Sequence, residues 1–416
     1  MKILWVKGGK LLPVDTGGKI RSINILRQLA VRHELTLLSY YGGQRDEAYE
    51  SEIARQFPGA VTVHTAAPDS NILRQALDYA LNIPSPAPYA VTKFTSSKVK
   101  RLLKGWLAER REAGLPFDVA VCDFLSASLN FPSALHTPTV LFQHNVESIL
   151  WQRQSLHEPD LFKRTAFKLE AAKMTRYERA AVGRFHHVIA VSEHDRQLMS
   201  EMTDPSRISV VPTGVDLQKY RPGPSATAPL VIFTGSMDWE ANIDGCDYFC
   251  REVWPSVRER VPGVHLRIVG RNPHPRVKKL AGEDIEVTGT VPSVTEHLRE
   301  AAVVVVPLRI GGGTRLKIYE AMAMGKAVVS TSIGAEGLDV NHKSDILIAD
   351  EAGEFARSVI TLLTDEQLRQ RIEGEAARQA AAYDWPVIAD RFEEVLARVR
   401  VSAEAMSDIA PVAVRI

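Results

Sequence analysis

Short apolar runs alternate along the first half of the chain with segments whose apolar residues recur at helical spacing. Residues 2–7 form one such run, and after a loop comes an expected helix whose apolar face carries Ile20, Ile23, Leu26 and Leu29. The other runs expected as strands are ELTLLSYY, AVTVHT, FDVAVCDF, TVLFQHN, HHVIAVS and RISVVPTG. Strands this apolar, separated by helices, predict a parallel sheet covered on both faces.

The pattern changes at residues 212–230, where four prolines predict a linker or hinge. A second series of expected strands follows: LVIFTG, VHLRIVG, IEVTGTV, AVVVVPL, AVVSTS and DILIAD. We therefore predict an α/β protein with two doubly wound Rossmann-like domains, 1–212 and 213–383. An amphipathic helix at 384–402 is expected to return to the first domain, and 403–416 to form a tail. Ligands bind at the carboxyl ends of parallel strands, so we expect the site in a cleft that both sheets face.

Composition narrows the class of protein. The chain has 416 residues, 45% of them hydrophobic and 24% charged, which is typical of a soluble globular protein. The net charge of +1 argues against nucleic acid as a general partner. Three cysteines without paired metal-type spacing indicate a reducing compartment. With no evident signal peptide and no run of membrane-spanning length, we expect a cytoplasmic protein.

The stretch IGGGTRLKIYEAMAMGKAVVST, residues 310–331, carries the clearest candidate chemistry. Glycines lead into an expected helix at 314–324, whose first N–H groups suit phosphate oxygens. Arg315 and Lys317 add positive charge, and the Glu320 carboxylate could accept two hydroxyl hydrogen bonds, as from a ribose. The alternative is a Gly-rich turn before an ordinary solvated helix, with Glu320 as a stabilising charge.

This stretch resembles the donor site of the GT-B glycosyltransferases, in particular the large retaining family that includes bacterial mannosyl- and glucosyltransferases. The segments VVPTGVDLQKYRP, TVLFQHNVE, RYERAAVGRFHHVIAVSEHDR and LVIFTGSMDW are similar to other landmarks of that family, in the same order. The resemblance implies sugar transfer from a UDP or GDP type of nucleotide sugar to a carbohydrate or lipid-linked acceptor, with retention and without a metal. The implied setting is polysaccharide or glycolipid assembly.

The resemblance also implies roles for residues of the second domain. Glu320 would bind the ribose, and Val291 would lie at the base. The residues implied for the diphosphate and its surroundings are Gly235, Ser236, Arg271, Gly313, Thr314, Arg315 and Leu316.

Two departures from the family pattern concern charge. Gly312 stands where the family usually has a first glutamate, separated by seven residues from the second, that contacts the donor sugar. The segment GSMDWEANIDG lacks the basic residues that commonly face the phosphates. We hypothesise that Arg315 and Lys317 replace those charges.

In the first domain, the expected site residues lie at strand ends. Gly17 and Gly18 precede a helix, and the resemblance places their loop over the donor phosphate and beside the acceptor; a plain turn is the alternative. His144 follows a strand and matches a family histidine that contacts the donor sugar. Asp123 ends another strand and is a candidate for binding acceptor hydroxyls or for capping a helix.

Other interpretations stay open at this point. The basic helix expected at 96–112 could rest on anionic lipid at the inner face of the membrane, or it could be a solvated outer helix. A nucleotide-sugar epimerase on the same scaffold and a non-catalytic nucleotide-sugar binding protein are the alternatives to a transferase.

Overall fold

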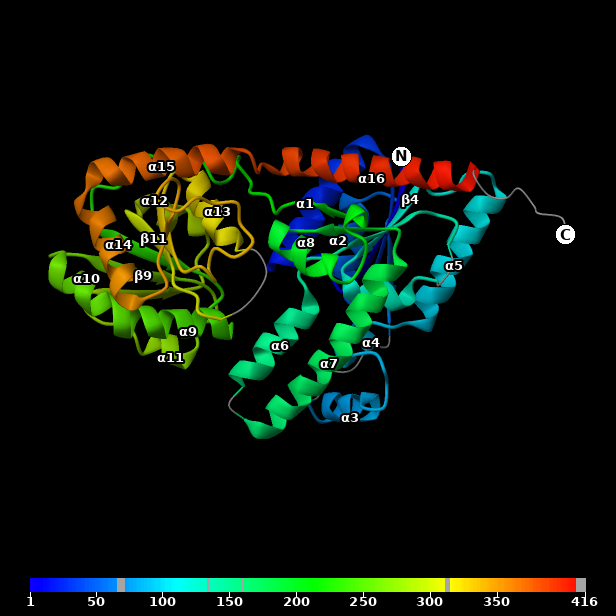
Figure 1. Cartoon of the computed structure of the whole chain (residues 1–416), viewed down its shortest axis with the longest axis horizontal. Coiled ribbons are helices and arrows are strands. Elements are labelled where there is room, and N and C mark those ends of the chain that lie inside the picture. The colour runs from blue at the N-terminus through cyan, green and yellow to red at the C-terminus, as the bar shows by residue number, and fades with distance from the viewer. Residues whose placement is uncertain (66–71, 133–134, 159, 311–314, 409–416) are drawn as a thin grey trace. The chain divides into compact units, whose positions relative to one another are not determined.

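The structure is a computed structural model, which describes residues 1–65, 72–132, 135–158, 160–310 and 315–408. The chain folds into two compact units (Figure 1). Unit 1 comprises Met1–Val211 and the chain from Ile388 onward, and unit 2 comprises Pro212–Val387. The expected parallel α/β organisation is found in each unit.

In the described part of unit 1, seven parallel strands form a sheet in the order β3-β2-β1-β4-β5-β6-β7. The strands are β1 (Lys2–Gly8), β2 (Glu34–Tyr41), β3 (Val61–His64), β4 (Val119–Asp123), β5 (Thr139–Phe142), β6 (His187–Ala190) and β7 (Ile208–Val210). The order reverses between β1 and β4, where Lys7 lies opposite Asp123 in register. Such a switch point is where open α/β sheets bind ligands.

The helices of unit 1 connect these strands and cover the sheet. They are α1 (Gly17–Arg32), α2 (Glu47–Gln56), α3 (Ile72–Asn82), α4 (Tyr89–Thr92), α5 (Ser97–Glu112), α6 (Glu147–His157), α7 (Leu161–Arg184) and α8 (Glu193–Ser200), with 3-10 turns at Leu125–Asn130 and Pro205–Arg207. In α5, Val99 and Leu103 are fully buried in the core. The apolar residues of this basic helix therefore pack inward, as expected of an outer helix of the fold.

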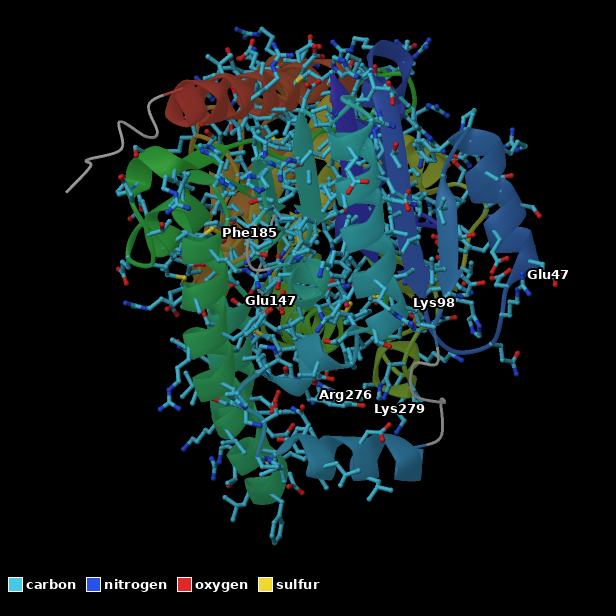
Figure 2. The ribbon with its side chains drawn as sticks, turned by 90° about the vertical axis from the view of Figure 1, so that its right-hand side faces the viewer. Glu47, Lys98, Glu147, Phe185, Arg276 and Lys279 are labelled. Atoms are coloured by element: carbon cyan, nitrogen blue, oxygen red, sulfur yellow. The ribbon has the colours of Figure 1, made fainter. Side chains whose placement is uncertain are left out.

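Two features of unit 1 lie away from its sheet. Helices α6 and α7 form a hairpin whose far end projects beyond the strands, and α3 lies beside that end in two perpendicular views (Figures 1 and 2). The Tyr79 hydroxyl donates to the Ala166 carbonyl at 3.4 Å, and Lys173 Nζ donates to the Asn82 carbonyl at 3.0 Å. These contacts attach α3 to α7.

The described part of unit 2 contains a second parallel sheet, ordered β10-β9-β8-β11-β12-β13. Its strands are β8 (Leu230–Thr234), β9 (His265–Val269), β10 (Ile285–Gly289), β11 (Val303–Val306), β12 (Ala327–Ser330) and β13 (Leu347–Ile348). Its helices are α9 (Glu240–Tyr248), a π-helical segment (Phe249–Val253), α10 (Trp254–Arg260), α11 (Pro275–Lys278), α12 (Val294–Glu300), α13 (Leu316–Ala323), α14 (Ala352–Thr364) and α15 (Glu366–Ala381). Here the order reverses between β8 and β11.

The final helix, α16 (Trp385–Asp408), is longer than expected: the sequence pattern ended it at residue 402. Phe392 packs on Trp5 and Phe142 of unit 1, with ring centroids 5.5 and 5.1 Å apart. Arg32 of α1 also pairs with Asp390 at 2.6 Å. None of the described helices has the length and apolarity needed to cross a membrane.

Candidate functional site

In unit 1 the carboxyl ends of β1, β4 and β5 bring a buried polar network together. Asp123, with no exposed surface, accepts hydrogen bonds from Trp5 Nε1 at 2.9 Å, Lys7 Nζ at 2.9 Å and His144 Nε2 at 2.7 Å. Parallel register places Lys7 beside Asp123, and Asp123 beside Phe142, two residues before His144. The fold of the sheet itself therefore assembles this network.

The charges in the network determine which nitrogen of His144 carries the proton. Burial would raise the pKa of Asp123, but the Lys7 ammonium and the His144 bond more than offset it and hold that pKa well below its usual range. Burial lowers the pKa of His144 to about 4, so the ring is neutral at pH 7. An ionised Asp123 can only accept a hydrogen bond, so His144 Nε2 carries the hydrogen and Nδ1 keeps a lone pair.

His144 Nδ1 is an acceptor that the described residues leave unused. It is buried and has no hydrogen-bond partner among the described residues. A Cβ atom on Gly18 would lie 4.0 Å from it, so the backbone of α1 passes close by. Gly17 and Gly18 open α1, and the residue before them, Thr16, makes no side-chain capping bond. The helix start and the free nitrogen together offer both donors and an acceptor to a ligand.

The Asp123 carboxylate is fully buried, and both of its oxygens accept hydrogen bonds from other side chains, His144 Nε2 among them. The expected roles of Asp123, in binding acceptor hydroxyls or in capping a helix, stay predictions. Lys7 and Trp5 were missed by the sequence analysis; the available signal was a lysine near the end of an otherwise apolar strand.

A pair of carboxylates in unit 1, Glu147 and Glu178, was also missed. Glu178 on α7 is fully buried and accepts bonds from Gln143 Nε2, the Glu147 and Ser148 amides, and Ser148 Oγ, at 2.6–3.0 Å. Burial, followed by the nearby Glu178 charge, raises the pKa of Glu147 to about 7. Glu147 follows His144 by three residues and is only half-buried, so it is a further polar group at this strand end.

In unit 2, Glu320 occupies the second turn of α13. Its carboxylate accepts a hydrogen bond from the Tyr220 hydroxyl at 2.8 Å, and in the described part of the chain this is its one hydrogen bond. Burial raises the pKa of Glu320, and the Tyr220 bond partly opposes that effect. One carboxylate oxygen is thus held in place, while the other has no hydrogen-bond partner among the described residues and suits a ligand hydroxyl. Tyr220 comes from the segment that the sequence analysis interpreted as a linker.

Lys317, one turn before Glu320 on α13, lies beside the end of β8. Its Nζ donates to Asn242 Oδ1 at 2.9 Å, and a Cβ atom on Gly235 would lie only 2.8 Å from it. Burial, then the neighbouring Arg315 charge, lowers the pKa of Lys317 to about 7. An anion bound beside Lys317 would stabilise its charged ammonium form and so raise this pKa.

Further polar groups surround this position. Arg271 Nε donates to Ser236 Oγ at 2.9 Å, and Asn242 Nδ2 donates to the Ser236 carbonyl at 2.7 Å. Arg315 is 5% exposed and lies over the Trp239 ring, 5.5 Å from its centroid, directly before α13. These contacts bring the strand end after β8, the strand end after β9 and the start of α13 into one cluster.

The close approach of these strand ends depends on glycine. A Cβ atom on Gly270, after β9, would lie 1.7 Å from the Gly235 carbonyl oxygen, so no other residue fits there. Among the remaining expected site residues, Leu316 is the first residue of α13. Val291 lies in the loop after β10, two strands from β8 in the sheet order. Gly312, Gly313 and Thr314 lie outside the described residues.

Comparison with known protein families gives matches over most of the chain. Two family models match: Glycosyltransferase Family 4 over residues 17–219 and Glycosyl transferases group 1 over residues 228–365. The chain belongs to the GT-B glycosyltransferases of this family. The expected glycosyltransferase family is thereby confirmed, whereas retention stays a prediction.

Curated relatives of this glycosyltransferase match over part of their length. The phosphatidyl-myo-inositol mannosyltransferase of Mycolicibacterium smegmatis is 28% identical over 236 residues, 53% of this chain and 58% of that protein. The GDP-mannose-dependent alpha-(1-6)-phosphatidylinositol monomannoside mannosyltransferase of Mycobacterium tuberculosis is 27% identical, over 50% and 61% of the two chains. The chain thus spans little more than half the length of these relatives.

Solved structures match over nearly the whole glycosyltransferase chain. Sucrose-phosphate synthase from Thermosynechococcus elongatus superposes with a TM-score of 0.68 and 15% identity, covering 96% of this chain and 99% of that one. Anabaena Alr3699/HepE, in complex with UDP, superposes with a TM-score of 0.64 and 17% identity, covering 96% and 100%. At these identities the likeness establishes the fold.

Proposed function

We propose that the chain transfers a hexose from a nucleoside diphosphate sugar, of UDP or GDP type, to a hydroxyl of a carbohydrate or lipid-linked acceptor. The observation that carries the proposal is the cluster in unit 2, where Lys317, Arg271 and Ser236 surround the glycine-lined strand end and Glu320 lies one turn along the same helix. Phosphate-binding and hydroxyl-binding groups are thus spaced along a single helix, as a ribose diphosphate requires.

The donor is held in two parts. Tyr220 orients the Glu320 carboxylate, and its second oxygen accepts hydrogen bonds from the ribose hydroxyls. The diphosphate lies against Gly235 and Ser236, with Lys317, Arg315 and Arg271 supplying positive charge. As the family resemblance implies, we also propose that backbone amides of Gly313, Thr314, Arg315 and Leu316 hold the diphosphate and that Val291 lies at the base. This assignment accounts for the missing basic residues after β8, because α13 and the strand end after β9 supply them.

Departure of the nucleoside diphosphate leaves negative charge on the leaving oxygen, and the same cations stabilise that charge in the transition state. The proton on Lys317 is held more firmly as negative charge builds up beside it. We therefore expect transfer to proceed without a divalent cation.

For unit 1 by itself, we propose that His144 Nδ1 accepts a hydrogen bond from a sugar hydroxyl and that the amides of Gly17 and Gly18 bind phosphate. Asp123 and Lys7 fix the ring. Retention at the anomeric carbon by front-face substitution, and a cytoplasmic location at the inner face of the membrane, complete the proposal. The named relatives act on phosphatidylinositol lipids, which supports glycolipid or polysaccharide assembly as the setting.

A thermal-shift screen with UDP, GDP and their common sugar conjugates tests the donor assignment. We expect one nucleotide and one conjugate to raise the melting temperature of wild type and to have a much smaller effect on Glu320→Gln. Nucleoside diphosphate release is then measured with and without candidate acceptors, and the products are analysed. Epimerised donor without any acceptor would show an epimerase, and no stabilisation by any nucleotide would overturn the proposal.

A further inference from the structure

Exposed apolar side chains gather at one end of unit 1. Phe162 is 89% exposed and Leu161 66% exposed at the start of α7, and Leu156 is 73% exposed at the end of α6. On α3, which is attached to α7 near this end, Leu77 and Leu81 are 58% and 69% exposed. Figures 1 and 2 show α3 and the end of the hairpin together in both views. We call these five side chains the apolar end.

Such a cluster needs a partner. Single exposed leucines are normal on a protein surface, but large apolar side chains grouped on a projecting element mark an interaction site. Core packing does not explain them, because the hairpin already buries Ala171, Met174, Ala181 and Val182 on its inner side. The apolar end therefore lies beyond the part of the hairpin that stabilises unit 1.

The charges on α7 identify the kind of partner. Its basic residues Lys163, Lys168, Arg176 and Arg179 are exposed. Its two acids are turned inward instead, since Glu170 is 2% exposed and Glu178 is fully buried.

Both buried acids are used within the protein. Glu170 accepts a bond from the Tyr89 amide at 2.8 Å, and Glu178 holds the start of α6. Of the acids nearby, Glu158 is half-buried and accepts a hydrogen bond from the Asp160 amide, and the exposed Asp160 caps α7 by accepting one from the Lys163 amide. The accessible charge along α7 itself is thus positive.

A cavity beside α3 also combines basic and apolar side chains. It has a volume of about 640 Å³ and is bordered by Leu81 of the apolar end. Lys93, Lys98 and the hydroxyls of Ser96 and Ser97 line it, with Asp78 as the acid among its lining residues. Ammonium and hydroxyl donors next to an exposed leucine suit an anionic headgroup whose hydrocarbon lies alongside.

We propose that the apolar end docks on an anionic lipid bilayer, with Phe162, Leu161 and Leu156 entering the interfacial layer and the basic residues of α7 facing lipid phosphates. Apolar insertion combined with positive charge is the physical basis of peripheral attachment. A second copy of the chain is a poorer partner, because pairing two such ends would bring like-charged α7 faces together. Helix α5 is not the docking element, because its apolar residues Val99 and Leu103 belong to the core.

Vesicle co-sedimentation of the full chain tests the proposal, with phosphatidylcholine alone and with phosphatidylcholine and phosphatidylglycerol in equal parts. We expect binding to the anionic vesicles that weakens with salt, and little binding to the neutral ones. The double variant L161S/F162S should lose binding about tenfold or more. Val31→Ser is the matched control, since Val31 is 84% exposed on α1, and it should bind as wild type does.

Three further variants separate the alternatives. Gln at Lys163 and Lys168 should weaken binding, whereas Gln at Lys100 and Arg101 of α5 should have little effect. The substitution Phe162→Trp should give added fluorescence that shifts to shorter wavelength on anionic vesicles only. All of these positions are exposed, so melting temperatures and nucleotide binding should stay unchanged.

Binding of L161S/F162S at the wild-type level, absence of wild-type binding, or loss only in the α5 variant would overturn the proposal. Self-association of wild type without lipid that disappears in L161S/F162S would assign the apolar end to a second copy instead. None of these outcomes bears on donor binding by unit 2, so failure here leaves the proposed transfer activity in place.

Discussion

Lys317 should make donor binding depend on pH. Its pKa of about 7 in the free protein means that the ammonium form declines above neutral pH. If the donor diphosphate lies beside its Nζ, binding favours the protonated form and raises the pKa of Lys317 in the complex. The donor is then bound together with a proton, and its affinity falls as the pH rises through 7.

The size of the effect follows from the same pKa. At pH 6 about nine-tenths of the free protein carries the ammonium, and at pH 8 about one-tenth does. If the pKa of Lys317 in the complex lies above 9, the dissociation constant should rise roughly tenfold from pH 6 to pH 8, which is about 1.4 kcal/mol. A nucleotide sugar is the right ligand, because its diphosphate is esterified at both ends and keeps its charge throughout this range.

Isothermal titration of UDP- or GDP-sugar between pH 6 and pH 8.5, in buffers of differing ionisation enthalpy, measures both the affinity and the proton uptake. Lys317→Met should bind weakly with a flat profile. Lys317→Arg should also be flat, since a guanidinium stays charged at every pH used. Glu320→Gln should weaken binding yet keep the wild-type slope. A flat wild-type profile, or an equal slope in Lys317→Met, would refute the placement of the diphosphate beside this residue.

Further predictions concern the groups around these sites. Glu320→Gln should weaken donor binding by about 1.5–3 kcal/mol, the value of a hydrogen bond to a charged group, and Tyr220→Phe should weaken it by less. Titration of both variants and of the double variant should show non-additive losses of binding free energy. Fully additive losses would contradict the coupling of the two residues. Because the pKa of His144 is about 4 in the folded protein and 6.5 in an unperturbed ring, unfolding takes up a proton between these values, so stability should be lost as the pH falls through that window. The loss in the free energy of unfolding amounts to about 3 kcal/mol. Urea unfolding from pH 7.5 to 4 should show a flatter pH dependence of this free energy in His144→Gln than in wild type. An equal pH dependence in the two proteins would count against the buried neutral ring. Asp123→Asn should cost about 3–5 kcal/mol of stability, because the buried Lys7 ammonium loses its counter-charge, and an unchanged unfolding midpoint would rule out the ion pair seen here.

The elements that follow from local pattern were predictable. Apolar runs such as residues 303–306 are typical of buried strands in an alternating chain, and the glycine pairs or runs that precede α13 and begin α1 indicated helix starts. Cys246, by contrast, gave no signal of chemistry and is simply buried in α9. Local periodicity and turn residues were therefore sufficient for the fold class.

Partners that come from distant segments could not be predicted in the same way. Glu178 lies on α7, yet it holds the start of α6, 30 residues earlier in the chain. From the sequence, Lys7 is an ordinary strand residue, and only the strand register shows that it lies beside Asp123. Tyr220 is likewise predicted as a linker residue, and only the structure shows its hydrogen bond to Glu320, 100 residues later. Side-chain pairing of this kind depends on tertiary structure, which periodicity does not encode.

A crystal structure of the chain with the nucleoside diphosphate identified by the screen tests the central proposal most directly. We predict ribose hydroxyls within about 3 Å of the Glu320 carboxylate, and diphosphate oxygens beside the Gly235 backbone and Lys317 Nζ. A nucleotide bound elsewhere, or bound there with its base in place of the ribose at Glu320, would contradict it.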